Sequence, residues 1–146
     1  MKLFTYNDGG RKTAGYTGKT NDCVVRAIAI ATEKPYKEVY EEINKLAKDE
    51  RITKRLRTHS NSRTGVHKKT YERYLKDLGW EWIPTMKIGS GCKFHLVPWE
   101  LPEGRLICRL SKHLTTMIDG IIHDTHDPSR SGTRCVYGYY QKGGEK

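Results

Sequence analysis

Hydrophobic residues recur at helical spacing in the first half of the chain and alternate with polar residues in the second half. Spacings of three and four residues predict helices at about 22–32, 35–49 and 67–78. From Trp80 the period changes to two, which predicts strands instead. The expected strands are Trp80–Pro84, Arg105–Leu110, His113–Ile118, Ile121–Thr125 and Cys135–Gln141, with a strand fragment at Leu3–Tyr6.

Helical segments that precede a run of strands predict one α+β domain over residues 1–146. Its helical part covers about 21–79 and packs on a C-terminal antiparallel sheet at about 80–142. Residues 50–66 are basic and lack a helical period, so we expect a mobile surface loop there. Residues 143–146 are expected to form a tail.

The start of the first helix carries a cysteine. Thr20 or Asn21 is expected to be the N-cap, which places Cys23 in the first turn. Cys23, Ala27 and Ile30 then share one face, so the thiol lies at the edge of the buried stripe. The positive end of the helix dipole at this point favours the thiolate.

A predicted hairpin carries a histidine and an aspartate. Asp119-Gly120 is a preferred two-residue turn, and it sets the pairing of the two strands. The expected pairs are Ile118 with Ile121, Met117 with Ile122, Thr115 with Asp124, and His113 with His126. His113 and Asp124 are then diagonal neighbours on one face, within reach of a hydrogen bond. Asp127 would point to the opposite face.

Cys23, His113 and Asp124 together supply a nucleophile, a base and an acid that orients the base. The same residues resemble the papain-like superfamily of cysteine peptidases in its small bacterial and phage forms. The resemblance runs from about Asn21 to Gln141 and rests on Asp22-Cys23 at a helix start, on His113 at a strand start, and on the hairpin that leads to Asp124.

This resemblance implies a papain-like fold and a thiol hydrolase, either a peptidase, an amidase or an isopeptidase, without a cofactor or metal. Asp127-Pro128 is similar to the Asp-Pro that carries the third catalytic residue in bacteriocin-processing members, so Asp127 is the alternative acid. Uncharacterised small phage proteins also carry Asn-Asp-Cys near the start, which implies a phage origin and the host cytoplasm.

The chain departs from the family at the oxyanion donor. Papain-like enzymes usually carry a Gln several residues before the Cys, and residues 16–19 contain none. Asn21, or the hydroxyl of Thr17 or Thr20, would have to donate beside the Cys23 backbone N–H.

Composition indicates a folded protein, with 36% hydrophobic residues in 146. No segment approaches the roughly 18 apolar residues of a membrane span, and Met1–Asp8 lacks the apolar core of a signal peptide. We therefore expect a cytoplasmic protein that does not bind a membrane, with all four cysteines reduced.

The net charge of +10 is uneven, because residues 51–73 carry eight Lys and Arg against Glu72 alone. Such a surface attracts an acidic protein or peptide, or nucleic acid. One alternative function is therefore a basic module that binds nucleic acid or a host protein, with a vestigial thiol site. A second is a structural zinc domain, in which Cys92 and His95 would be joined by Cys108, Cys135, His123 or His126.

Overall fold

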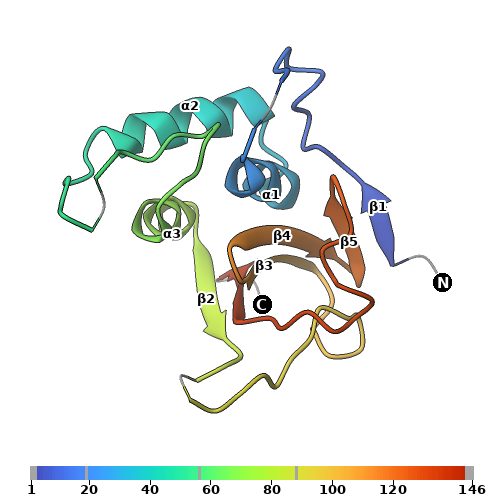
Figure 1. The fold of residues 1–146 in the computed structure, drawn as a ribbon. Helices are drawn as coiled ribbons and strands as arrows, with labels where there is room; N and C mark the ends of the chain where they lie inside the picture. The colour runs from blue at the N-terminus through green and yellow to red at the C-terminus, as the bar shows by residue number, and fades with distance from the viewer. Residues whose placement is uncertain (1–2, 19, 56, 88, 144–146) are drawn as a thin grey trace.

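The computed structural model describes residues 3–18, 20–55, 57–87 and 89–143, and it is a mixed α/β structure. Its helices gather on one side of a sheet (Figure 1). The helices are α1 (Cys23–Thr32), α2 (Tyr36–Ala47) and α3 (Lys68–Asp77). The strands are β1 (Phe4–Tyr6), β2 (Trp80–Pro84), β3 (Arg105–Leu110), β4 (His113–Ile118), β5 (Ile121–Asp124) and β6 (Gly138–Lys142).

The sheet has six strands in the order β1-β5-β4-β3-β6-β2. Its C-terminal strands are antiparallel as predicted, but β1 adds to β5 in parallel, with Phe4 opposite Ile122. The sheet as a whole is therefore mixed, because the N-terminal strand lies outside the predicted antiparallel sheet of about 80–142. A three-residue strand carries too little pattern to reveal its direction or partner.

Two hydrophobic clusters pack on the sheet. The first joins the three helices to the sheet through Ile107, Leu114 and Tyr140. The second contains Leu106, Met117 and other strand residues, together with Leu96 and Leu101 from the long β2–β3 connection. The alternation along β3 and β4 thus feeds both clusters, which fixes the register of these strands.

The predicted boundaries need three corrections. The N-cap of α1 is Asp22, not Thr20 or Asn21, and its carboxylate makes no capping hydrogen bond. Strand β5 ends at Asp124 because the Thr125 N–H donates to the Asp124 side chain at 2.7 Å. Strand β6 begins at Gly138, since Cys135 instead forms an isolated bridge with His95.

The segment 50–66 is only partly the free loop that its composition predicts. Residues 51–55 and 57–59 are exposed, but Ser60 and Ser62 are buried. The Ser62 N–H donates to Asn44 Oδ1 at 2.8 Å, and Ser60 donates to the Glu50 carboxylate. Hydrogen bonds to α2 and its C-terminal extension thus fix the second half of the segment.

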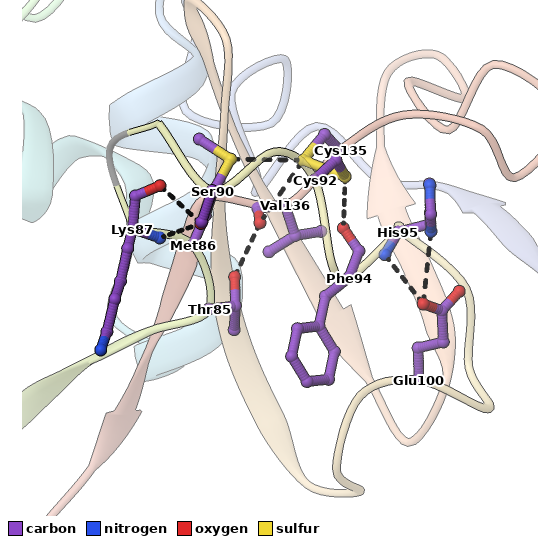
Figure 2. Close-up of a disulfide and its surroundings, with 10 residues drawn as sticks. All are labelled: Thr85, Met86, Lys87, Ser90, Cys92, Phe94, His95, Glu100, Cys135 and Val136. Atoms are coloured by element: carbon purple, nitrogen blue, oxygen red, sulfur yellow. Dashed lines mark hydrogen bonds and ion pairs between the residues drawn. A yellow bond between two sulfur atoms is a disulfide. The ribbon is translucent and has the colours of Figure 1, made fainter.

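Cys92 and Cys135 form a disulfide, with Cα atoms 5.8 Å apart (Figure 2). It ties the β2–β3 connection to the segment before β6, beside the Met86 sulfur at 3.9 Å. The expectation of four reduced cysteines is therefore wrong for this pair. The predicted zinc alternative also loses two of its thiolates. Cys23 and Cys108 remain as free thiols.

Two further findings bear on earlier expectations. None of the helices in the described ranges is long and apolar enough to cross a membrane. Gly143, expected to begin the tail of residues 143–146, donates its backbone N–H to the Gly79 carbonyl at 2.8 Å and is therefore held in place. Residues 144–146 of that tail lie outside the described residues, as do Met1, Lys2 and Lys19.

Candidate active site

Cys23 is the first residue of α1, and its side chain is half-buried. A residue at this position has a backbone N–H without a helical acceptor, and it feels the positive end of the dipole. Cys108, by contrast, is fully buried in β3, and burial raises the pKa of its thiol to about 12. Of the two free thiols, only Cys23 combines access with an activating position.

His113 and Asp124 come from the β4–β5 hairpin. Asp119 and Gly120 adopt positive φ values of 47° and 82°, and Ile118 pairs with Ile121 as predicted. His113 lies at the start of β4, and its Nε2 is 2.8 Å from Asp124 Oδ2 at the end of β5. The turn therefore brings this histidine and this carboxylate into direct contact.

The His113 ring also forms a hydrogen bond with the Cys23 side chain. Because Nε2 is engaged by Asp124, Nδ1 is the ring nitrogen left for the thiol. Burial raises the pKa of the Cys23 thiol, but the hydrogen bond and charge of His113 outweigh it, so the pKa is lowered overall. A hydrogen bond from the Leu114 backbone and the charge of Arg26 add to this effect.

The histidine is shifted in the opposite direction. Burial lowers the pKa of His113, but hydrogen bonds to Asp124 and Cys23 raise it to about 9. A lowered thiol pKa and a raised imidazole pKa favour a thiolate–imidazolium pair at neutral pH. Such a pair holds both a nucleophile and a proton donor.

Asp124 is buried and is held ionised by its surroundings. Burial raises the pKa of this carboxyl, but hydrogen bonds from His113 and Thr115 lower it to about 2. The Thr115 hydroxyl donates to Oδ2 at 2.7 Å, and Arg26 Nη2 lies 3.4 Å from Oδ1. Each carboxylate oxygen thus has a donor besides the peptide N–H of Thr125.

A buried polar cluster behind the cysteine was missed by sequence reasoning. Arg26 bridges Asp124 to Asp22, and Asp22 also accepts from the Tyr36 hydroxyl. Arg11 Nε lies 3.5 Å from the same Asp22 carboxylate. The available signal was the spacing of Asp22 and Arg26, which are four residues apart, with the arginine inside an otherwise apolar helix.

The predicted oxyanion donors lie near the thiol but differ in their availability. Thr20 already donates its hydroxyl to the Arg63 carbonyl at 3.0 Å. Asn21 is exposed and lines the pockets around Cys23, and its amide makes only a 3.4 Å contact to the Thr64 carbonyl. Thr17 lines one of these pockets as well. Asn21 is thus freer than Thr20 to turn toward a bound carbonyl.

Asp127 is placed differently from Asp124. Its side chain is exposed and accepts from the Ser129 N–H at 2.9 Å, across Pro128. It therefore shapes the turn after β5, and His113 takes Asp124 as its partner. The His126 ring lies against His113, with centroids 5.2 Å apart.

Two pockets meet at the cysteine. One has a volume of about 600 Å³ and is lined by residues of the N-terminal segment, including Tyr6 and Tyr16. The other, about 330 Å³, lies between α1, α3 and the β3–β4 turn. Asn21, Cys23 and His113 line both pockets. An extended chain that fills both would pass directly over the thiol.

No group of three or more His, Cys, Asp or Glu is arranged to hold a metal ion within the part of the chain that the structure describes. His95, from the predicted zinc alternative, instead contacts Glu100 at 3.3 Å (Figure 2). The side chains around Cys23 suit acyl transfer through a thiolate, in which the protein's own side chains move the protons.

Comparison of the chain with family models, with curated proteins and with solved structures found no match. The resemblance to papain-like peptidases therefore stays a prediction.

Proposed function

We propose that this protein is a thiol hydrolase of papain-like type that cleaves an amide or isopeptide bond. The observation that carries the proposal is the contact series from Cys23 through His113 to Asp124. Each member is shifted toward the charge that catalysis needs, with a lowered thiol pKa, a histidine pKa of about 9 and an aspartate pKa of about 2. Perturbation of this kind by specific partners is typical of catalytic groups.

In the proposed reaction the Cys23 thiolate attacks the substrate carbonyl carbon. The Cys23 backbone N–H and the Asn21 amide donate to the oxyanion. The His113 imidazolium then passes its Nδ1 proton to the leaving amine as the C–N bond breaks, which leaves a thioester on Cys23. Water attacks that thioester while His113 accepts a proton from the water. The acid product then leaves, and the thiolate–imidazolium pair is restored.

Asp124 acts throughout on the imidazole rather than on the substrate. Its hydrogen bond to Nε2 keeps a proton on that nitrogen and directs Nδ1 toward the thiol. Arg26 holds the same carboxylate from the other side, so the acid is fixed by two groups. This arrangement supports Asp124, rather than Asp127, as the orienting residue.

An activated ester tests the proposal without knowledge of the natural substrate. We expect p-nitrophenyl acetate to acylate Cys23, and the adduct to be seen by intact-protein mass spectrometry and located by peptide mapping. Cys23→Ala should abolish the adduct, whereas Cys108→Ala, which removes the buried free thiol, should leave it. Absence of both an adduct on Cys23 and a Cys23-dependent release of p-nitrophenol in the wild-type protein would contradict the proposal.

A basic binding module is the second candidate, favoured by the exposed cations of residues 51–59, which include Arg51, Arg55 and Arg57. If nucleic acid is its ligand, binding should fall steeply between about 50 and 200 mM salt. Reversal of Arg55 and Arg57 to Glu should weaken it further. Binding that ignores both changes would remove this candidate.

A further inference from the structure

The smaller pocket beside Cys23 is lined by cations from three separate elements. Lys68 is the first residue of α3, Arg109 lies in β3, and Lys112 lies in the β3–β4 turn. Of the described residues that line this pocket, none is Asp or Glu. Among the described residues, none of the three cations forms an ion pair. Their charges are therefore left for a ligand.

The opposite pocket is different, because its charges are partly compensated. Three cations and Asp8 line it, and two of the cations, Arg11 and Arg26, are already paired with buried carboxylates. The smaller pocket therefore has the larger excess of unpaired positive charge. An extended substrate would meet this charge on one side of its scissile bond.

The start of α3 adds to the same positive potential. Helix N-termini carry a partial positive charge that acidic residues in the first turn commonly offset. The first turn of α3 contains no acidic residue, but Glu50 accepts from the Thr70 hydroxyl there and offsets the charge of the helix end from outside. The positive charge that α3 adds to this pocket is therefore that of the Lys68 side chain.

The pocket also offers apolar surface and one fixed cation. Val24, Tyr71 and Leu114 are buried residues in its lining, suited to packing against a methylene stem. The Arg109 guanidinium is held 5.5 Å from the centre of the Trp82 ring. An aliphatic stem that ends in a carboxylate matches this combination.

We propose that this pocket is a substrate subsite that binds an acidic residue, Asp or Glu, next to the bond that Cys23 attacks. This inference rests on the proposed hydrolase function and adds the substrate class. Charge complementarity and the shared lining of Asn21, Cys23 and His113 place the carboxylate beside the reacting carbonyl. Lys68 and Lys112 are specificity residues here, with no part in the bond-breaking steps.

Alkylation of Cys23 tests the subsite without requiring turnover. Iodoacetate carries a carboxylate and iodoacetamide is its neutral analogue, so the ratio of their rates reports positive charge at the thiol. Relative to free cysteine, we expect the ratio to favour iodoacetate by about tenfold at low salt, and the preference to shrink as salt is added. Lys68→Gln with Lys112→Gln should reduce the ratio several-fold and leave the iodoacetamide rate unchanged.

Lys76→Gln with Lys37→Gln is the matched control, because this variant also removes two positive charges, from exposed positions on α3 and α2 that do not line the pocket. It should not change the ratio. A wild-type ratio equal to that of free cysteine, or one that ignores Lys68→Gln with Lys112→Gln, would overturn the subsite. Failure of iodoacetamide itself to label Cys23 below pH 8 would instead count against the proposed hydrolase.

Once a peptide substrate is in hand, matched peptides carry the test to turnover. A peptide with Glu next to the cleaved bond should have a higher kcat/KM than its Gln counterpart, by about tenfold. The double variant should remove that preference, with the kcat/KM for the Glu peptide falling to that for the Gln peptide. Equal kcat/KM for the two peptides at every flanking position would also overturn the subsite.

Discussion

Replacement of Asp124 by asparagine removes one buried negative charge and keeps the shape of the side chain. Burial lowers the pKa of His113, and the hydrogen bond to Asp124 is the largest effect that raises it to about 9. An adjacent opposite charge commonly changes a pKa by about 1–3, so we expect the Asn variant to bring His113 to about 7 or below. At pH 8 the imidazolium fraction would fall from about nine-tenths to about one-tenth.

The measurement is an NMR titration of the His113 ring nitrogens in the wild-type protein and in Asp124→Asn. Asp127→Asn is the control, because Asp127 lies three residues away and is exposed. It should leave the His113 pKa near 9. A His113 pKa that stays near 9 in Asp124→Asn, or that falls in Asp127→Asn, would refute this reasoning.

The same variant has a defined effect on stability. A lowered carboxyl pKa contributes stability that is present above 3.8, the ordinary pKa, and is lost as the pH falls toward about 2. This difference corresponds to about 2 kcal/mol, and Asp124→Asn should abolish it. The raised pKa of His113 makes stability fall as the pH rises through about 9, but the lowered pKa of Cys23 acts in the opposite sense. The slopes of these two contributions with pH therefore have opposite signs.

Three further predictions follow from the same contacts. Cys23→Ala should abolish hydrolysis and cost about 1 kcal/mol in urea unfolding, because the side chain is small and half-buried; a variant that still turns over substrate would contradict the nucleophile assignment. Arg26→Leu should lower the free energy of unfolding by about 3–5 kcal/mol, because it leaves Asp22 and Asp124 buried without their shared cation. Arg57→Leu, at an exposed position, should lower it by under about 0.5 kcal/mol, and equal urea midpoints for the two variants would contradict this. Cys92→Ser with Cys135→Ser should lower the free energy of unfolding by up to about 4 kcal/mol, because the disulfide spans 43 residues. An unchanged free energy of unfolding would contradict a stabilising role.

Strong local patterns made most of the fold predictable from the sequence. The hairpin is the clearest case, because Asp119-Gly120 both selects the turn and sets the pairing of Ile118 with Ile121. The same register predicts from the sequence that His113 and Asp124 lie on one face within reach of a hydrogen bond. The helices likewise followed from their apolar stripes, with ends that shifted by only one or two residues.

The remainder depended on contacts between distant parts of the chain. The parallel pairing of β1 joins Phe4 to Ile122, and no local pattern encodes a partner so far away. The Cys92–Cys135 disulfide needs the two segments to meet, and cysteine spacing alone does not give a pairing. The Asp22–Arg26–Asp124 cluster likewise forms only because α1 lies over the end of β5. Only the pair of Asp22 and Arg26, four residues apart on one helix, is predictable from the sequence.

The proposed hydrolase function depends on the activation of Cys23 by His113. Its most direct test is the rate of iodoacetamide labelling of native protein as a function of pH, in the wild type and in His113→Ala. Cys92 and Cys135 are paired and Cys108 is fully buried, so Cys23 is the thiol that reacts. We predict a wild-type midpoint well below about 8.5, the pKa of a free thiol, and a higher midpoint in His113→Ala. A wild-type midpoint at or above that value, or identical profiles for the two proteins, would contradict the account.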